Sequence, residues 1–365
     1  MVARRRAILA STFAIVALLT SGCATVALDQ ARSSYNRGEL VEAEAFLDQD
    51  TIPEKDKVLY LMERGAIRQE LGQYEASSAD FIAAHAELER LETYSLSKGG
   101  ASLLVNDTVQ EFVGVPCERS LLHVMTAWNH LALGDWDQAG VEARRLIRSL
   151  SAERRGEYPE DAFSRYLAGL CLELLNDDSN AAQQYAHAAR ILASDGINAD
   201  SATGPELVIL LQTGRMGEQA PDPEVEIRHG EASLGYARLL TDLDQLSQTS
   251  RLLHAKSQIK KAAVRIALKE GVTQIINHNV DPLVGDLARL ILIAGLERPD
   301  TRAWLALPSG FLVARVPCPT DLDEVELRLP DGSIHSISAR IHRAGSLRIA
   351  LVRISPNGPQ TAFED

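Results

Sequence analysis

A repeated helical hairpin is the feature that most constrains how this chain folds. Residues 122–145 form two amphipathic segments joined by a turn at Gly134. Counting seven residues back and five forward from this glycine reaches Ala127 and Ala139, both small enough to let two helices pack closely. The same count around an earlier glycine also reaches small residues: Gly65, Gly72 and Ser77. The chain therefore repeats a helix–turn–helix unit.

Aligning the chain on the turn residue extends the pattern to four units, with turns at Gly38, Gly72, Gly134 and Asn176. The first two turns are 34 residues apart, which is the period of the tetratricopeptide repeat. The pattern resembles that repeat, and we predict a tetratricopeptide-like α-solenoid over residues 23–195. The wider later spacings place insertions after units two and three. The longer insertion, about residues 95–118, is predicted to be an ordered loop because it contains an apolar run.

The pattern changes beyond residue 195, where short alternating runs predict strands. We expect a linker and first strand at 196–230, a helical insertion at 231–298, an antiparallel β module at 299–356 and a tail at 357–365. The first strand, at residues 207–211, is expected to join the sheet at its edge, because a lone strand leaves backbone groups unpaired. The predicted fold class is mainly α with a smaller β part (α+β), a solenoid followed by a small sheet or sandwich.

The N-terminus predicts export. Three arginines among the first six residues precede an apolar run at 7–19, which is shorter than the roughly 20 residues that span a bilayer. The residues before Cys23 resemble a bacterial lipobox. We predict a lipoprotein signal peptide over residues 1–22 and lipidation of Cys23, with an ordinary signal peptide as the alternative. Ala24 favours the outer membrane, facing the periplasm, as the location of the anchor.

Net charge and cysteine content indicate which kinds of partner and ligand are disfavoured. The formal net charge of −13 disfavours nucleic acid. Beyond Cys23 the cysteines are Cys117, Cys171 and Cys318, and no C-x-x-C pair suggests a metal site. These three cysteines allow one disulfide, but at least one cysteine is expected to be buried as a small apolar side chain. We expect no cofactor and no metal.

No set of catalytic residues emerges. Ser95 and Lys98 have the Ser-x-x-Lys spacing of penicillin-binding enzymes, but the sequence lacks the accompanying Lys-Thr-Gly. His123 and His130 lie two helical turns apart, about 10 Å, which is too far for both to bind one metal, and both fall at packing positions. No phosphate loop or zinc-protease motif occurs. We therefore predict that the protein is not an enzyme.

Four motifs occur in chain order: Asn-Asp at 106–107, Glu-Arg at 118–119, Val-Glu-Ala-Arg-Arg at 141–145 and Arg-Ala-Trp-Leu-Ala-Leu-Pro at 302–308. In this order they resemble an uncharacterised family of bacterial lipoproteins. Members of that family have N-terminal tetratricopeptide-like helices and a C-terminal β segment. The resemblance implies the same architecture for this chain and specifies no activity.

The polar residues of these motifs form the candidate binding site: Asn106, Asp107, Glu118, Arg119, Glu142, Arg144 and Arg145. In one interpretation, the arginines bind carboxylates and loop carbonyls and pin the insertion onto the solenoid. In the other, the residues rim a groove that receives a peptide or glycan, because solenoids present a concave surface to extended partners.

Three functional hypotheses follow. The first is a membrane-anchored, periplasm-facing scaffold for protein–protein interaction, without catalysis, that binds an unidentified envelope protein in envelope assembly or peptidoglycan synthesis. The second is an envelope carbohydrate binder or hydrolase that uses Asn106, Glu118 and Arg144. The third is a structural spacer between membrane and cell wall.

Overall fold

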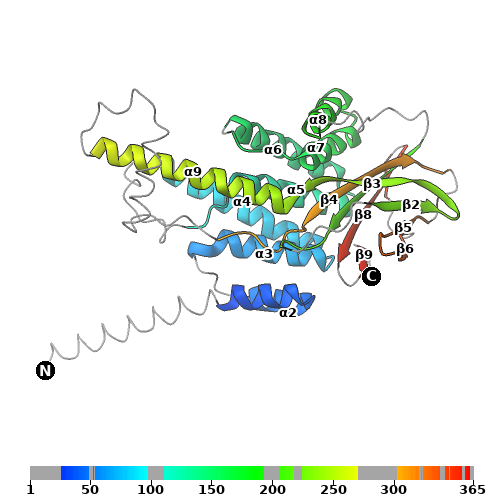
Figure 1. The fold of residues 1–365 in the computed structure, drawn as a ribbon, viewed down its shortest axis with the longest axis horizontal. Coiled ribbons are helices and arrows are strands. Elements are labelled where there is room, and N and C mark those ends of the chain that lie inside the picture. Colours follow the sequence, from blue (N-terminus) through cyan, green and yellow to red (C-terminus); the bar gives the residue numbers. More distant parts are fainter. Residues whose placement is uncertain are drawn as a thin grey trace.

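The structure is a computed structural model (Figure 1). It describes residues 26–48, 52, 54–97, 111–155, 157–192, 205–217, 224–269, 302–319, 322, 324–337, 342–344, 346–355 and 358–361. Several predicted features lie outside these residues: the signal peptide, Cys23, the Asn-Asp pair at 106–107, the linker near residue 200 and the C-terminal half of the predicted helical insertion. Within the described residues, no helix combines the length and apolar character that crossing a membrane requires.

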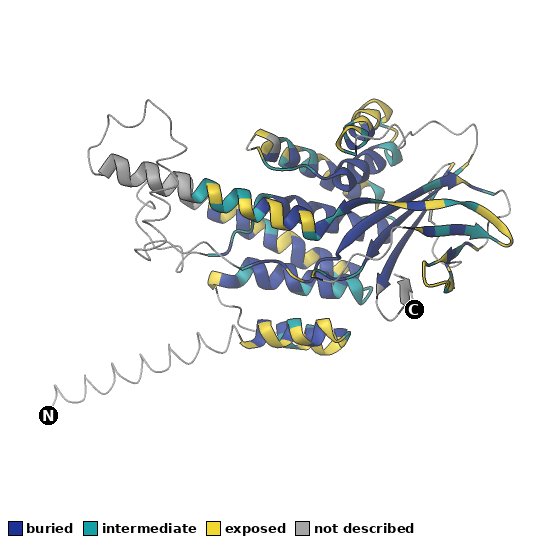
Figure 2. Ribbon diagram, in the orientation of Figure 1, coloured by how far each residue is buried: buried dark blue, intermediate teal, exposed yellow. Residues whose placement is uncertain are grey.

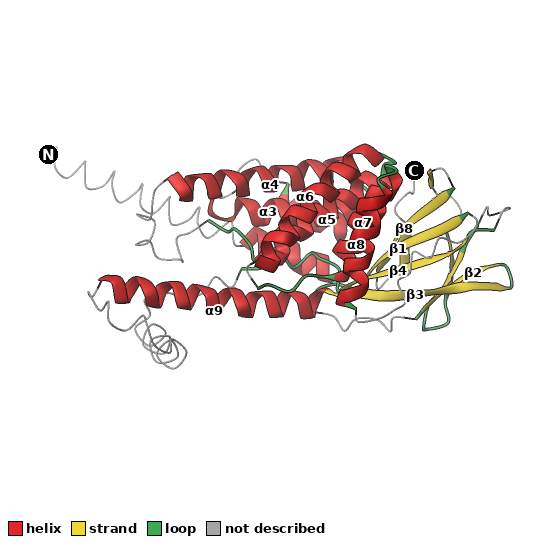
Figure 3. Ribbon diagram, turned by 90° about the horizontal axis from the view of Figure 1, so that it is seen from above, coloured by secondary structure: helices red, strands yellow, loops and turns green. Residues whose placement is uncertain are grey.

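The N-terminal half is the predicted solenoid of four helical hairpins. The first pairs a helix over residues 26–36 with α2 (Leu40–Leu47). The following three hairpins are α3 (Lys57–Glu70) with α4 (Tyr74–Ser97), α5 (Pro116–Ala132) with α6 (Trp136–Arg155), and α7 (Ala162–Leu174) with α8 (Asp178–Ile191). Figure 3 shows the helices from α3 to α8 stacked beside the sheet. The prediction of a tetratricopeptide-like solenoid in an α+β fold is confirmed.

The residues that revealed the repeat also explain its packing. All four turn residues have a positive φ, between 57° at Asn176 and 82° at Gly38, a backbone conformation that glycine adopts without strain. A Cβ atom on Gly65 would lie 2.5 Å from the Phe81 ring, and one on Gly169 would lie 2.8 Å from Tyr185. The small residue of one helix therefore makes room for the aromatic ring of the next.

The C-terminal half is a curled, mixed sheet. Its described strands are β1 (Glu206–Thr213), β2 (Val225–His229), β3 (Ala232–Asp242), β4 (Gly310–Pro317), β5 (Glu326–Arg328), β6 (Ile334–Ser336), β7 (His342–Ala344), β8 (Leu347–Ser355) and β9 (Gly358–Thr361). They follow the order β6-β5-β2-β3-β4-β1-β8-β7, with β9 also paired to β8. The β1–β8 pair is parallel, so the expectation of a purely antiparallel module is wrong.

The position predicted for the first strand is also wrong. β1 is a central strand, hydrogen-bonded to β4 on one side and β8 on the other. The physical reason is burial on both faces. Val208 and Leu210 pack toward the helices, whereas Ile209 and Leu211 pack into a second core on the far face of the sheet. A continuous apolar run is typical of a strand that is covered on both sides.

The helical insertion predicted at 231–298 begins too early, because residues 232–242 form β3. Leu239 and Leu240 fit a helical stripe in the sequence, yet Leu239 is paired with Leu312 of β4, next to an irregularity in the register. The helix that follows is α9 (Leu243–Lys269), which contacts α5 along the side of the solenoid (Figure 3).

Solenoid and sheet share one hydrophobic core, seen as the dark interior of Figure 2. Phe163 of α7 stacks on Phe311 of β4, with ring centroids 4.1 Å apart, and Trp128 of α5 lies 6.3 Å from Phe311. Gln212 of β1 donates a hydrogen bond to Gln69 of α3 at 2.9 Å. The face formed by the first helix of each hairpin is therefore covered by the chain's own sheet.

Candidate functional site

An extended segment, residues 302–307, covers more of that first-helix face and is bound much as a peptide ligand would be. Glu63 of α3 accepts hydrogen bonds from the backbone N–H groups of Leu305 at 3.0 Å and Ala306 at 2.8 Å. Arg32 pairs with Glu63 at 2.6 Å and donates to the Ala303 carbonyl at 2.5 Å. The side chains of Glu63 and Arg32 are therefore not available to bind a partner peptide.

Glu118, one of the predicted site residues, holds the same segment. It accepts hydrogen bonds from the Trp304 N–H at 3.0 Å and the Val115 N–H at 2.9 Å, and Arg251 lies 3.8 Å away. Burial raises the pKa of its carboxyl above the ordinary value, and the backbone donors only partly oppose this. Trp304 is completely buried, with its ring centroid 5.7 Å from that of Phe81. Glu118 therefore faces the interior of the protein.

Arg119, the next predicted site residue, bridges the end of the long insertion and α4. Its Nε donates to the Val113 carbonyl at 3.1 Å, and its guanidinium forms an ion pair with Glu92. The neighbouring Phe112 is buried, and its N–H donates to the Lys55 carbonyl at 2.8 Å. These contacts match the interpretation in which an arginine pins the insertion onto the solenoid.

The Val-Glu-Ala-Arg-Arg motif of α6 divides between two sides of the helix. Glu142 is buried between His123 at 2.8 Å and Arg145 at 2.6 Å. Burial opposes ionisation of Glu142, but these two partners outweigh it and hold its pKa below the ordinary value. Arg144 is exposed on another side, where it donates to the Gly140 carbonyl at 3.3 Å. The structure therefore separates Arg144 from the other described site residues.

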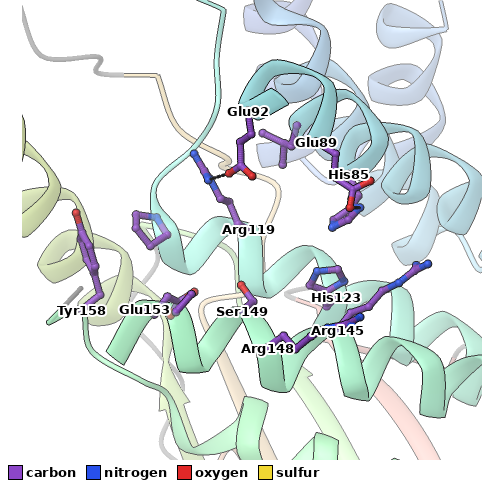
Figure 4. A pocket seen from close by; sticks show the side chains of 13 residues that line it. His85, Glu89, Glu92, Arg119, His123, Arg145, Arg148, Ser149, Glu153 and Tyr158 are labelled. Carbon is purple, nitrogen blue, oxygen red and sulfur yellow. Dashed lines mark hydrogen bonds and ion pairs between the residues drawn. The ribbon is translucent and has the colours of Figure 1, made fainter. Parts of the chain in front are cut away.

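Beside these residues lies an open groove of about 580 Å³ between α4, α5 and α6, which we call the α4–α6 groove (Figure 4). It is lined by His85, Leu88, Glu89 and Glu92 of α4, Pro116, Arg119 and His123 of α5, Arg145, Arg148, Ser149, Ala152 and Glu153 of α6, and Tyr158. Of the candidate site residues, only Arg119 and Arg145 line it. Glu118, Glu142 and Arg144 do not, and Asn106 and Asp107 lie outside the described residues.

The two ends of the α4–α6 groove differ in charge. At one end, Arg145 and Arg148 lie near a pair of histidines from neighbouring helices, His85 and His123, whose ring centroids are 4.7 Å apart (Figure 4). Burial and the proximity of His123 lower the pKa of His85. The Arg119–Glu92 ion pair joins α5 to α4 between the two ends of the groove. At the other end is Glu153, a buried carboxyl for which the described residues offer no ion pair within 4 Å.

Glu153 is the groove residue whose acidity is most altered. Burial raises its pKa from the ordinary 4.5 to about 7, and the hydrogen bond from Ser120 opposes this only in part. The Ser120 hydroxyl also lies 2.8 Å from the Ser149 hydroxyl, so Ser120 links Glu153 to Ser149. A carboxyl group of this kind exchanges protons near neutral pH.

We expect Glu153→Gln to make the protein less sensitive to pH. Since the folded-state pKa is raised, the wild-type carboxyl favours folding fully below pH 4.5, and this contribution is lost as the pH rises toward 7. Glutamine does not titrate. The variant should therefore gain up to about 3 kcal/mol of unfolding free energy over wild type between pH 5 and pH 8. Urea unfolding at the two pH values measures this, and an equal difference at both would contradict it.

The described residues contain no cluster of three or more His, Cys, Asp or Glu side chains placed to hold a metal ion. Cys117, Cys171 and Cys318 are all buried, and Cys117 and Cys171 are not joined by a disulfide. Burial raises the pKa of the Cys171 thiol to about 12, so it packs as a small apolar group. The expectation of at least one buried cysteine is confirmed.

Comparison with known proteins gives no match to any family model and no match to a curated protein. Among solved structures, the apo form of RapI shares 14% identity with a TM-score of 0.34, over 46% of this chain and 42% of that one. The Rap conjugation gene regulator of plasmid pLS20, in complex with the Phr* peptide, shares 13% identity with a TM-score of 0.30, over 48% and 49%.

A third structure, MamA 41-end from Desulfovibrio magneticus RS-1, shares 13% identity with a TM-score of 0.23, over 48% of this chain and 97% of that one. The chain spans less than half the length of the two Rap proteins. With scores this low, the fold assignment depends on the hairpin geometry described above.

Three residues that line the groove are not among those predicted from the sequence: His85, Arg148 and Glu153. The available signal was helical spacing: Arg148 lies three residues after Arg145, on the same face of α6. For His85 the sequence contains no such signal. It lies on α4, about sixty residues earlier in the chain, and is next to α6 only because the hairpins stack.

Proposed function

We propose that the protein is a non-catalytic interaction scaffold of the bacterial cell envelope, anchored by a lipid on Cys23, and that it binds a partner protein in the α4–α6 groove. The observation that carries the proposal is the division of the solenoid into two surfaces. The first-helix face is filled by the chain's own sheet and by residues 302–307. The α4–α6 groove stays open and is lined mainly by charged and polar residues.

The proposed setting comes from the sequence. The N-terminal pattern favours export and lipidation, and the ordered motifs resemble an uncharacterised lipoprotein family of the same architecture. The expected location is the outer membrane, facing the periplasm, and the expected process is envelope assembly or peptidoglycan synthesis. A net charge of −13 disfavours nucleic acid as a partner.

We expect Cys23→Ser to release the protein from the membrane. Serine cannot form the thioether that carries the diacylglycerol, so the variant should appear in the soluble fraction without the lipid mass. Fractionation and intact-mass measurement test this together. An unchanged membrane fraction for the serine variant would contradict a lipid anchor at Cys23.

We expect Arg148→Glu to lower recovery of the partner at least tenfold when cells carrying the anchored protein are treated with a chemical crosslinker and the protein is purified. The reversed charge would oppose a ligand group that meets Arg148 in the groove. The matched control is Arg144→Glu, since Arg144 is also exposed and lies on the same helix but does not line the groove. Equal recovery with both variants would overturn the groove as the partner site.

A second candidate function is supported by Glu153, since a groove carboxyl with a pKa of about 7 suits a general acid in glycan hydrolysis. This is the hypothesis of a carbohydrate binder or hydrolase with Glu153 as the acting residue. Glu118 and Arg144 do not serve, because Glu118 is buried and Arg144 does not line the groove. Digestion of purified peptidoglycan by the wild type, abolished by Glu153→Gln, would support hydrolysis. No digestion, together with partner recovery, supports the scaffold. If no partner is recovered and deletion of the gene alters the distance between membrane and cell wall, a structural spacer is favoured.

A further inference from the structure

The dimensions of the α4–α6 groove match a short extended peptide. The lining residues span eight positions of α4 (85–92), eight of α5 (116–123) and nine of α6 (145–153). With a rise of about 1.5 Å per residue, these stretches are about 10 to 12 Å long. An extended chain advances about 3.3 Å per residue, so about four residues fit along the groove.

The end of the groove near Arg145 suits a carboxylate. Arg148 is exposed and forms no hydrogen bond or ion pair with the described residues, and Arg145 is 42% exposed and bonds Glu142 through one nitrogen. Two guanidinium groups one helical turn apart therefore have N–H donors left for a ligand. The histidines beside them add hydrogen-bonding groups. Glu142 is already bound on both sides, so it competes little for a new partner.

The opposite end suits an ammonium group. Glu153 is buried at the groove wall, and among the described residues its carboxyl accepts one side-chain hydrogen bond, from the Ser120 hydroxyl. Tyr158 adds an aromatic ring at this end, where a cation would also be favoured. A bound amine would place a positive charge beside this carboxyl, which has no ion-pair partner within 4 Å among the described residues.

We propose that the α4–α6 groove binds an extended peptide segment of about four residues, with a carboxylate at the Arg145–Arg148 end and an ammonium group at the Glu153 end. This inference rests on the proposed function and specifies the chemistry of the partner.

The lining favours a peptide over a phosphate group. Glu89 and Glu92 line the opposite wall of the groove, where a concentrated negative charge would be repelled. A peptide spreads its charges along its length, and its backbone N–H groups donate to these carboxylates while its carbonyls accept from Arg119 and Ser149. The polar walls thus offer partners for both kinds of backbone group.

The test uses four fluorescein-labelled peptides with blocked ends, carried in identical Gly-Ser flanks: Lys-Ala-Ala-Glu, its reverse Glu-Ala-Ala-Lys, Ala-Ala-Ala-Ala and Glu-Ala-Ala-Glu. Binding to the mature full chain is measured by fluorescence anisotropy. One of the two mixed-charge peptides should bind at least tenfold more tightly than the other three. Equal affinities for all four would overturn the proposal, and so would displacement of the mixed-charge peptide by inorganic phosphate at lower concentration than by unlabelled peptide.

Variants of the protein test which end of the groove binds the carboxylate and which binds the ammonium group. Arg148→Glu should weaken the preferred peptide at least tenfold and favour the same peptide with its glutamate changed to lysine, whereas Arg144→Glu should change neither. Glu153→Gln should weaken only peptides that carry the amine. Equal effects of Arg144→Glu and Arg148→Glu would overturn the assignment. If crosslinking in cells recovers a partner through Arg148 but no peptide discriminates, the groove is the partner site and the peptide chemistry is wrong.

Discussion

Trp304→Ala is expected to lower the free energy of unfolding by about 3 to 5 kcal/mol, because it removes a completely buried indole and leaves a cavity. Trp304 lies on the short segment that crosses the first-helix face, against Phe81 of α4. Its backbone N–H is bound by Glu118, so loss of the side chain also weakens a hydrogen bond to a buried carboxyl. The shift in the urea unfolding midpoint measures the effect.

The matched control is Leu305→Ala in the same segment. Leu305 is 39% exposed, so its truncation should cost less than about 1 kcal/mol. Amide hydrogen exchange of residues 304–306 gives a second readout, because Glu63 and Glu118 accept from these three N–H groups. Similar midpoints for the two variants would show that the segment does not hold the solenoid face closed.

Glu70→Ala is expected to be similarly costly, at about 3 to 5 kcal/mol, because it leaves two buried arginines without their carboxylate. Glu70 closes α3 and lies 3.2 Å from Arg215, after β1, and 3.2 Å from Arg353 of β8. Tyr35 donates a further hydrogen bond to it at 2.8 Å. Burial opposes its charge, yet the two arginines hold the pKa of Glu70 below its ordinary value.

Glu39→Ala is the control for this change, since Glu39 pairs with Arg37 at the exposed start of α2 and the urea midpoint should stay where it is. If Glu70→Ala also left the midpoint unchanged, the ion-pair network would not join solenoid and sheet. If both variants lowered it equally, burial would not be the cause of the cost.

The helical half of the fold could be predicted because its signals are local. A residue with positive φ at each turn and a small residue facing an aromatic ring, as in Gly65 with Phe81, lie within one 34-residue unit. The sheet depends on distant pairings instead. The parallel contact of β1 with β8 joins residues about 140 positions apart, and a single sequence contains no signal for it.

Of the candidate site residues that the structure describes, only Arg119 and Arg145 line the groove. A rotation of about 100° per residue places Arg144 and Arg145 on different sides of α6. Burial of Glu118 could not be foreseen, because the segment that covers it lies nearly 190 residues later in the chain. The sequence motif that includes Trp304 instead forms part of the cover.

We propose that partners bind in the α4–α6 groove because the first-helix face is occupied by the chain itself. The most direct test places a photo-crosslinking amino acid at position 148 or at position 144 of the anchored protein in cells. We expect a covalent adduct with an envelope protein from position 148 and none from position 144. Adducts of equal yield from both positions, or from position 144 alone, would contradict it.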